Sequence, residues 1–456
     1  MGAIPGDIDT DRQPPMTLPL RHFLVGGGFL LVGSLVAVWS VVGGGRVALA
    51  HVHLLLVGWV CVTIMGAMTQ FVPVWSGVAL HSRRLASAQL WLVTAGLAGF
   101  ASALLAGAYD LLALPGAAML AGFWVFVYNI GRTLTALESY DVTERHFAFA
   151  LGCFLLVTVL GLVLAVGFAV PGVLPVPRPA AVAAHATLAV FGAVLATVHG
   201  ALYQLGTMFT GTDRDRTDRL LQRAETAGYP FGVLALAAGR LFAVPVVARL
   251  GGVLVVAGTL AVAIFLARHL RGATVDWTPM LTRYAVAALA LAAWALTALP
   301  GWLHAPTSPA RTFGGPSTHL LVLGGIGFVV AGTLYHIVPF IVWVHRYSDR
   351  VGLEPVPVVD DLYSDRLAAS DFALLVGGTA VLLTADAASL PPVAAAVGGL
   401  LVTLGVVAFG ANLLGVLRSH APRSLGAILL GSWGGDRQAG QGASEDSPAP
   451  PDGHDT

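Results

Sequence analysis

The chain has no lysine, only two cysteines and little charge for its length. Charged residues make up 11% of the 456 residues, and the 24 basic residues counted as Lys or Arg are all arginine. Cys61 and Cys153 both lie in apolar stretches, which excludes a disulfide framework and a cysteine-based zinc site. All five glutamates are expected in loops or a tail, so a buried carboxylate relay for proton pumping is not expected: Glu138, Glu144, Glu225, Glu354 and Glu445.

Apolar residues are abundant instead. They make up 56% of the chain, with a mean hydropathy of +0.80, more than one aqueous core could bury, so we expect a polytopic membrane protein in the lipid bilayer with no nucleic-acid partner. A spanning helix needs about 20 apolar residues. Twelve such runs occur, of which the seventh and eighth are interrupted by Arg240 and Pro245: 23–43, 48–75, 86–107, 110–135, 146–171, 180–210, 226–245, 247–270, 283–302, 316–345, 367–387 and 392–416.

The arginines indicate the orientation of these helices. With the N-terminus inside, one face carries 19 arginines and the other carries four, and Arg240 lies within a helix. Because cytoplasmic loops are enriched in Arg, this asymmetry predicts a multi-pass protein of the cell membrane with both termini in the cytoplasm. The N-terminus lacks the features of a removed signal peptide. We expect a cytoplasmic tail at 1–22, a membrane domain at 23–433 and a disordered cytoplasmic tail at 434–456, which is rich in Gly, Asp, Ser and Pro.

One pattern occurs three times. With Gly66 as the reference position, the same frame recurs at Gly200 and Gly332, after 134 and 132 residues. Each step spans four predicted helices, so the fold class is an all-α bundle of about 12 transmembrane helices in three pseudo-repeated four-helix units. Four further positions of the first copy align with positions of the third: His53 with His319, Gly58 with Gly324, Gln70 with His336, and Pro73 with Pro339. In the middle copy, His185 aligns with His51.

Histidine is the chemically informative residue of these repeats. Ionisable side chains in hydrocarbon are costly and normally face the bundle interior. Seven of the 14 histidines are predicted to be solvated or interfacial, at helix ends, in loops or in the tail: His22, His81, His146, His269, His345, His420 and His454. His304 falls in an outer loop. Six lie within apolar helices: His51, His53, His185, His199, His319 and His336.

The opening histidines of the repeats share one depth, because the second, sixth and tenth helices all cross the membrane in the same direction. Two imidazoles on separate helices can hold haem iron between them, and His53 with His319 is the expected pair for one haem b, without thioether links since no Cys-x-x-Cys-His occurs. His51 points about 200° away from His53 and could meet His185 in a second haem or metal site. Whether His51 or His53 is the axial ligand stays open.

Two arginines lie near these histidines on the outer face. Arg46 precedes His51 by five residues and Arg311 precedes His319 by eight. Both are candidate partners for haem propionates, and interfacial anchoring explains them equally well.

In these features the chain resembles subunit I of the haem-copper oxidases and nitric oxide reductases, which has twelve helices in three four-helix units and axial histidines on helices 2 and 10. The second predicted helix is also similar to the motif of NnrS proteins, membrane proteins with haem and copper that are linked to nitric oxide. NnrS proteins usually have an acidic residue where this chain has Leu54. The residues that carry this second resemblance are His53, Gly58, Trp59, Gly66, Pro73, Trp75 and Gly77.

The chain departs from the oxidases at two metal sites. They carry His-x-His on helix 10, where this chain has Ser317-Thr318-His319, so their high-spin haem ligand is absent. They bind copper with one histidine on helix 6 and two on helix 7. His199 is a copper candidate for the first position, but residues 226–245 contain no histidine, and a three-histidine copper site is not expected.

Two function classes follow. The first is a haem-binding protein of respiratory electron transfer or nitric oxide handling, which the resemblance would place beside a respiratory or denitrification partner subunit. The second is a twelve-helix transporter without haem. Transporters of this size commonly show six-helix halves, whereas the period here is four helices, which favours the first class. Whether the protein is an enzyme is not decided by the sequence.

Overall fold

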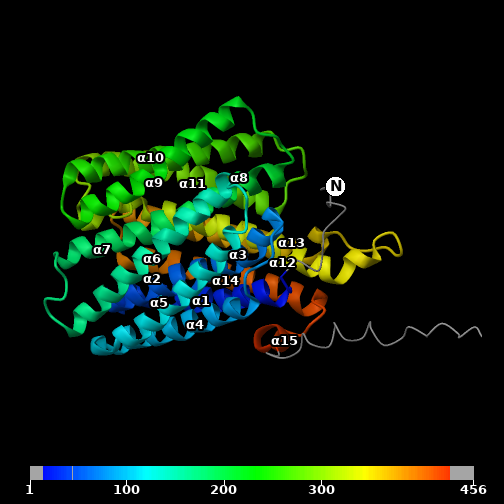
Figure 1. Ribbon diagram of the computed structural model, residues 1–456, viewed down its shortest axis with the longest axis horizontal. Coiled ribbons are helices and arrows are strands. Elements are labelled where there is room, and N and C mark those ends of the chain that lie inside the picture. The colour runs from blue at the N-terminus through cyan, green and yellow to red at the C-terminus, as the bar shows by residue number, and fades with distance from the viewer. Residues whose placement is uncertain (1–13, 44, 432–456) are drawn as a thin grey trace, which may run out of the picture.

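The computed structural model describes residues 14–43 and 45–431, and these are helices joined by loops without any strand. The long helices lie side by side along one axis of the molecule (Figure 1). The tail predicted at 434–456 lies outside the described residues. Of the tail predicted at 1–22, the described part already contains the start of α1, at Thr17.

The helices follow the predicted order of three four-helix units. The first unit contains α1 (Thr17–Gly43), α2 (Gly45–His53) with η1 (Leu54–Cys61) and α3 (Val62–Ser76), α4 (Arg83–Ala106), and η2 (Tyr109–Leu111) with α5 (Ala113–Leu134). The second contains α6 (Val142–Ala169), α7 (Arg178–Thr187) with η3 (Leu188–Leu195) and α8 (Ala196–Thr210), α9 (Arg216–Leu241) and α10 (Pro245–Arg271). The third contains α11 (Pro279–His304), η6 (Leu320–Gly327) with α12 (Phe328–Tyr347), α13 (Asp365–Ala387) and α14 (Pro392–His420).

Short helical segments occupy the ends and loops. They are η4 (Pro309–Arg311), η5 (Gly315–Ser317), η7 (Ser348–Arg350), η8 (Val359–Leu362) and α15 (Leu425–Leu430).

Eleven helices of the described chain are long and apolar enough to cross a membrane. The remaining long helix, α9, has 26 residues but is charged in its first half. It begins ten residues before the predicted run at 226–245. The prediction missed this start because hydropathy alone does not detect a charged helical segment. The protein is therefore a multi-pass membrane protein, and α9 is its least apolar long helix.

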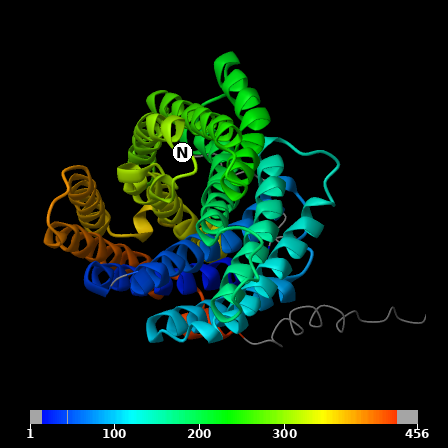
Figure 2. The same cartoon turned by 90° about the vertical axis from the view of Figure 1, so that its left-hand side faces the viewer.

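The bundle closes on itself. In each unit the third and fourth helices form a closely packed pair: α4 with α5, α9 with α10, and α13 with α14. The first helix, α1, packs against the last long helix, α14. At one end, Nε of Arg21 donates to the carbonyl oxygen of Ile428 at 2.9 Å, which joins the start of α1 to α15. Figure 2 looks along the bundle and shows the early, middle and late parts of the chain as neighbouring groups.

A π-helix interrupts the second helix of every unit at the same place in the repeat. The π-helices η1, η3 and η6 each have eight residues and each ends five residues before its reference glycine, which is Gly66, Gly200 or Gly332. Single turns of π-helix are rare and often occur at functional sites. His53, Thr187 and His319 directly precede the three π-helices. The repeat seen in the sequence is thus also a repeat of backbone geometry.

Candidate functional site

Four imidazoles lie at one level along the bundle, at the start of these π-helices. They belong to His51, His53, His185 and His319, and all four are half-buried. His51 and His185 occupy one position of the repeat, two residues before the position of His53 and His319. This layer is the one predicted to hold haem iron.

Each of the four rings is oriented through its Nδ1 atom. His51 Nδ1 lies 3.1 Å from the carbonyl oxygen of Gly33, and His185 Nδ1 lies 3.1 Å from that of Val157. His53 Nδ1 lies 2.9 Å from the carbonyl oxygen of its own helix residue Leu49. Because a carbonyl oxygen only accepts hydrogen bonds, Nδ1 must carry the proton in these three rings.

His319 has a carboxylate as its partner. Its Nδ1 lies 2.7 Å from Oδ2 of Asp386, near the end of α13. Within the described chain, no hydrogen bond is made by Nε2 of any of the four rings. Metal-bound histidines show this arrangement, in which one ring nitrogen donates to a carbonyl or carboxylate and the other binds the metal. The ring chemistry therefore fits axial ligation of haem iron.

Electrostatic interactions connect imidazoles that come from different units. The imidazole of His51 interacts electrostatically with that of His319, and the imidazole of His185 with that of His53. The sequence favoured His53 with His319 and His51 with His185. Both interactions join the later histidine position of one unit to the earlier position of the next.

The same relation leaves the third interface without histidine. It would bring Thr187 towards Ser317, where neither side chain resembles a haem ligand. The guanidinium of the buried Arg240 lies there instead, with NH1 donating to Thr187 Oγ1 at 2.7 Å and Nε donating to the carbonyl oxygen of Pro306 at 3.0 Å. Aromatic rings pack around it, and the guanidinium carbon lies 5.0 Å from the ring centroid of Trp302. Neighbouring ring centroids of the cluster lie 5.5 to 6.4 Å apart: Phe191, Trp294, Trp302 and Phe313.

Arg46 and Arg311, the predicted partners of haem propionates, form no hydrogen bond with the four histidines within the described chain. Arg46 is exposed at the start of α2. Arg311 is half-buried, with its side chain against Gly301 of α11. Its carbonyl oxygen accepts a hydrogen bond from Nε1 of Trp302 at 2.6 Å. Both arginines stay candidates because they precede His51 and His319 by only five and eight residues.

His199 lies away from the imidazole layer. It follows His185 by 14 residues, which is roughly 20 Å along a helix. Its Nδ1 lies 3.1 Å from Oε1 of Glu225. Within the described chain no group of three or more His, Cys, Asp or Glu side chains has the arrangement of a metal site. His336 packs against Phe209 and Phe340, with centroid distances of 4.3 and 5.7 Å.

The sequence analysis missed a set of buried polar clusters near the other end of the bundle. The expectation that all glutamates lie outside helices is wrong, because Glu225 is buried within α9 and Glu144 within the first turn of α6. Three histidines expected to be solvated are also buried: His22, His146 and His269. Loop assignments based on hydropathy failed here because these charged residues extend helices that continue beyond the apolar runs.

The clusters obey the pseudo-symmetry of the units. In the second unit, Glu225 accepts hydrogen bonds from His146 at 3.0 Å and from the Tyr203 hydroxyl at 3.3 Å. In the third unit, Asp371 pairs with Arg283 and accepts a hydrogen bond from Tyr335. His22 and Gln89 hold the corresponding positions in the first unit, and both are fully buried. His22, His146 and Arg283 lie against the reference glycines Gly66, Gly200 and Gly332.

A sequence signal for these clusters exists. The segments 82–89, SRRLASAQ, and 364–371, SDRLAASD, begin α4 and α13 and end at the buried Gln89 and Asp371. Each starting serine is held by an asparagine of the fourth helix, Asn129 or Asn412, through two hydrogen bonds of 2.8 to 3.0 Å. A phenylalanine precedes each asparagine by three residues. This second repeat extends the internal similarity of the first and third units to their third and fourth helices.

Comparisons with known proteins test the fold. No family model matches the chain, and no curated protein matches it either. Among solved structures, the chain is similar to a haem-copper terminal oxidase that was solved as a dimer, with a TM-score of 0.66 and 12% sequence identity over 90% of this chain and 85% of the oxidase chain. At that identity the likeness concerns the fold. The protein therefore has the polytopic helical fold of haem-copper oxidase subunit I, as the three-unit repeat predicted.

Proposed function

We propose that the protein is a haem-binding membrane protein in which His51 and His319 hold one b-type haem. The observation that carries the proposal is the state of the four imidazoles, each with Nδ1 engaged and Nε2 without a hydrogen bond. Haem bound in this way supplies one-electron redox chemistry. The chain's own contribution is to orient the rings through the carbonyl oxygen of Gly33 and the carboxylate of Asp386.

His53 and His185 form a second candidate site of the same kind. Their Nδ1 atoms are also bonded to carbonyl oxygens, at 2.9 and 3.1 Å. The ring of His185 lies over Gly161 of α6, where a side chain would meet it at 2.9 Å. Electron transfer between two such sites would suit a respiratory role, and the role in nitric oxide handling rests on the resemblance of the second helix to NnrS proteins. A respiratory or denitrification subunit is the partner that this role implies.

The test is the colour of the purified protein. We expect a b-type absorption spectrum, lost or strongly reduced in His319→Ala and His51→Ala. His304→Ala is the matched control, because His304 is exposed at the outer end of α11. Metal analysis of the same samples tests for copper, for which His199 is the candidate ligand. A colourless protein that is folded after expression with ample haem would contradict the proposal and favour transport.

A further inference from the structure

A cavity of about 640 Å³ lies between the first turns of α6 and the first half of α9. Three arginines line it, Arg145 from α6 and Arg219 and Arg223 from α9, together with His146. Within the described chain none of the three guanidiniums forms an ion pair, although Arg145 Nε donates to the carbonyl oxygen of Tyr140 and Arg219 NH1 to that of Arg214. Most of their N–H donors are therefore available to a ligand.

One carboxylate, that of Asp141, also lines the cavity. Partial burial opposes its ionisation, but hydrogen bonds with Glu144 and from the backbone N–H of Thr143 keep the pKa of Asp141 below its ordinary value. Those bonds cap α6, at 2.6 Å from Thr143 and 3.2 Å from Glu144. The carboxylate thus offsets only one of the three arginine charges, and the cavity stays cationic.

A buried hydroxyl provides an independent sign of a missing partner. Oγ1 of Thr226, which lines the cavity, is buried and has no hydrogen-bond partner in the described chain. A buried polar atom of this kind costs stability unless something binds it. Guanidinium groups donate strong and often bidentate hydrogen bonds to phosphate oxygens.

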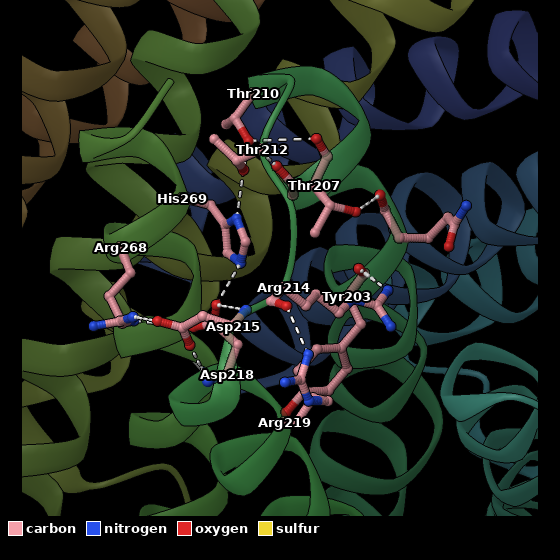
Figure 3. Close-up of polar contacts among 12 residues, drawn as sticks. Tyr203, Thr207, Thr210, Thr212, Arg214, Asp215, Asp218, Arg219, Arg268 and His269 are labelled. Carbon is pink, nitrogen blue, oxygen red and sulfur yellow. Dashed lines mark hydrogen bonds and ion pairs between the residues drawn. The ribbon is translucent and has the colours of Figure 1, made fainter. Parts of the chain in front are cut away.

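The first turn of α9, which carries Arg219, is held in place by α10. Nε of Arg268 donates to Asp218 at 2.9 Å and NH2 of Arg268 to Asp215 at 2.5 Å. Thr212 of the preceding loop contacts Nδ1 of His269 at 2.5 Å. Figure 3 shows this network around the loop between α8 and α9. The arginines on α9 are therefore presented by a fixed helix end rather than by a free loop.

An apolar surface continues from the cavity along α9. Phe231 and Leu234 are 59% and 44% exposed and lie one and two turns beyond Ala227, which lines the cavity. In a membrane protein such side chains face acyl chains. A polar pocket for a phosphate followed by an apolar stripe matches the two parts of a phospholipid, and basic pockets between membrane helices are known sites for anionic headgroups.

We propose that this cavity binds an anionic phospholipid, with its phosphate among Arg145, Arg219 and Arg223 and an acyl chain along Phe231 and Leu234. This site also accounts for the charged first half of α9, the least apolar long helix of the described chain. It uses none of the four imidazoles, so it does not depend on haem binding.

The experiment measures lipid binding to the purified full-length protein by native mass spectrometry, with phosphatidylglycerol and phosphatidylcholine as probes. We expect one tightly bound phosphatidylglycerol, and binding roughly 30-fold weaker in the double variant Arg219→Gln/Arg223→Gln. The matched control is Arg216→Gln, which removes an exposed charge of the same helix that does not line the cavity. Arg219→Lys/Arg223→Lys should retain much of the binding, because the charges remain.

Three results would overturn the proposal. One is an equal loss of binding in Arg216→Gln, which would indicate a general surface charge effect. Another is phosphatidylcholine binding as tightly as phosphatidylglycerol. The third is inorganic phosphate displacing the lipid and binding by itself, which would identify a soluble anion as the ligand. Size-exclusion profiles and thermal unfolding verify folding. If the glutamine double variant does not fold, Arg145→Gln, which removes the cavity arginine of α6, replaces it and should also weaken binding.

Discussion

The Nδ1 atom of His319 lies 2.7 Å from Oδ2 of Asp386, so α13 supplies a carboxylate to the proposed haem ligand on the neighbouring helix. The other three imidazoles use carbonyl oxygens. A carboxylate increases the basicity of the imidazole more than a carbonyl does and favours the more highly charged state of a bound metal. Among the four rings, His319 is therefore the one whose binding to a metal would depend on a carboxylate.

Asp386→Asn should raise the midpoint potential of the bound haem. If the carboxylate favours ferric over ferrous iron by tenfold, the rise is about 59 mV for a one-electron couple. Haem affinity should fall by about 10 to 100-fold. Redox titration and the ratio of haem to protein measure the two effects. Asp110→Asn, at an exposed acid between α4 and α5, should change neither, and an unchanged potential in Asp386→Asn would show that the contact has no influence on the iron.

The pairing of imidazoles can be tested by combining substitutions. If His51 and His319 hold the same haem, the double variant His51→Ala/His319→Ala should lose no more haem than either single variant, because one lost ligand already releases the group. His53→Ala/His185→Ala should behave likewise. The combination His51→Ala/His185→Ala should lose both haems. Haem content per protein distinguishes these cases, and non-additivity for His53 with His319 would restore the pairing expected from the sequence.

Glu225→Gln should destabilise the second unit. The carboxylate is buried and accepts hydrogen bonds from His146, His199 and Tyr203. Removing one partner of a buried charged cluster costs about 3 to 5 kcal/mol, because the remaining groups stay buried without compensation. Thermal unfolding in detergent measures the loss. Glu138→Gln, at an exposed loop residue, should have no measurable effect. A thermal unfolding midpoint of Glu225→Gln equal to that of the unchanged protein would mean that the cluster is not charged.

Several features of the fold and site could be predicted because they depend on local composition and on repetition. The twelve apolar runs, the four-helix period and the common depth of His51, His53, His185 and His319 need only helix length and spacing. The partners of these rings could not be predicted, because Gly33, Val157 and Asp386 come from other helices. Which imidazoles interact across units depends on which unit lies beside which, and the spacing of two residues along one helix contains no such information.

The buried polar clusters show a different failure. A hydropathy window places charged residues such as Arg219 and Glu225 outside the membrane helix, although α9 continues through them. The pattern that would have revealed them is a comparison between units, in which SRRLASAQ and SDRLAASD align. The signal was present at the third helix of the first and third units, where the histidine repeat does not extend.

The reference glycines should differ in their tolerance of alanine. An added Cβ would lie 2.5 Å from Cβ of His22 at Gly66 and 2.6 Å from Cβ of His146 at Gly200, but 3.1 Å from Cβ of Arg283 at Gly332. The first two substitutions require the first helix of the unit to move, since the contact is to a Cβ that cannot rotate away, and overpacking of this kind costs about 1 to 3 kcal/mol.

We therefore expect Gly66→Ala and Gly200→Ala to lower the thermal midpoint and the yield of folded protein more than Gly332→Ala. Gly131→Ala is the control, since an added Cβ there meets nothing within 4 Å. The measurement is fluorescence-detected size exclusion with a temperature series. Equal midpoints for all four variants would mean that the close approach of the first and second helices, which brings the carbonyl oxygens of Gly33 and Val157 to the imidazoles of His51 and His185, is not maintained by these glycines.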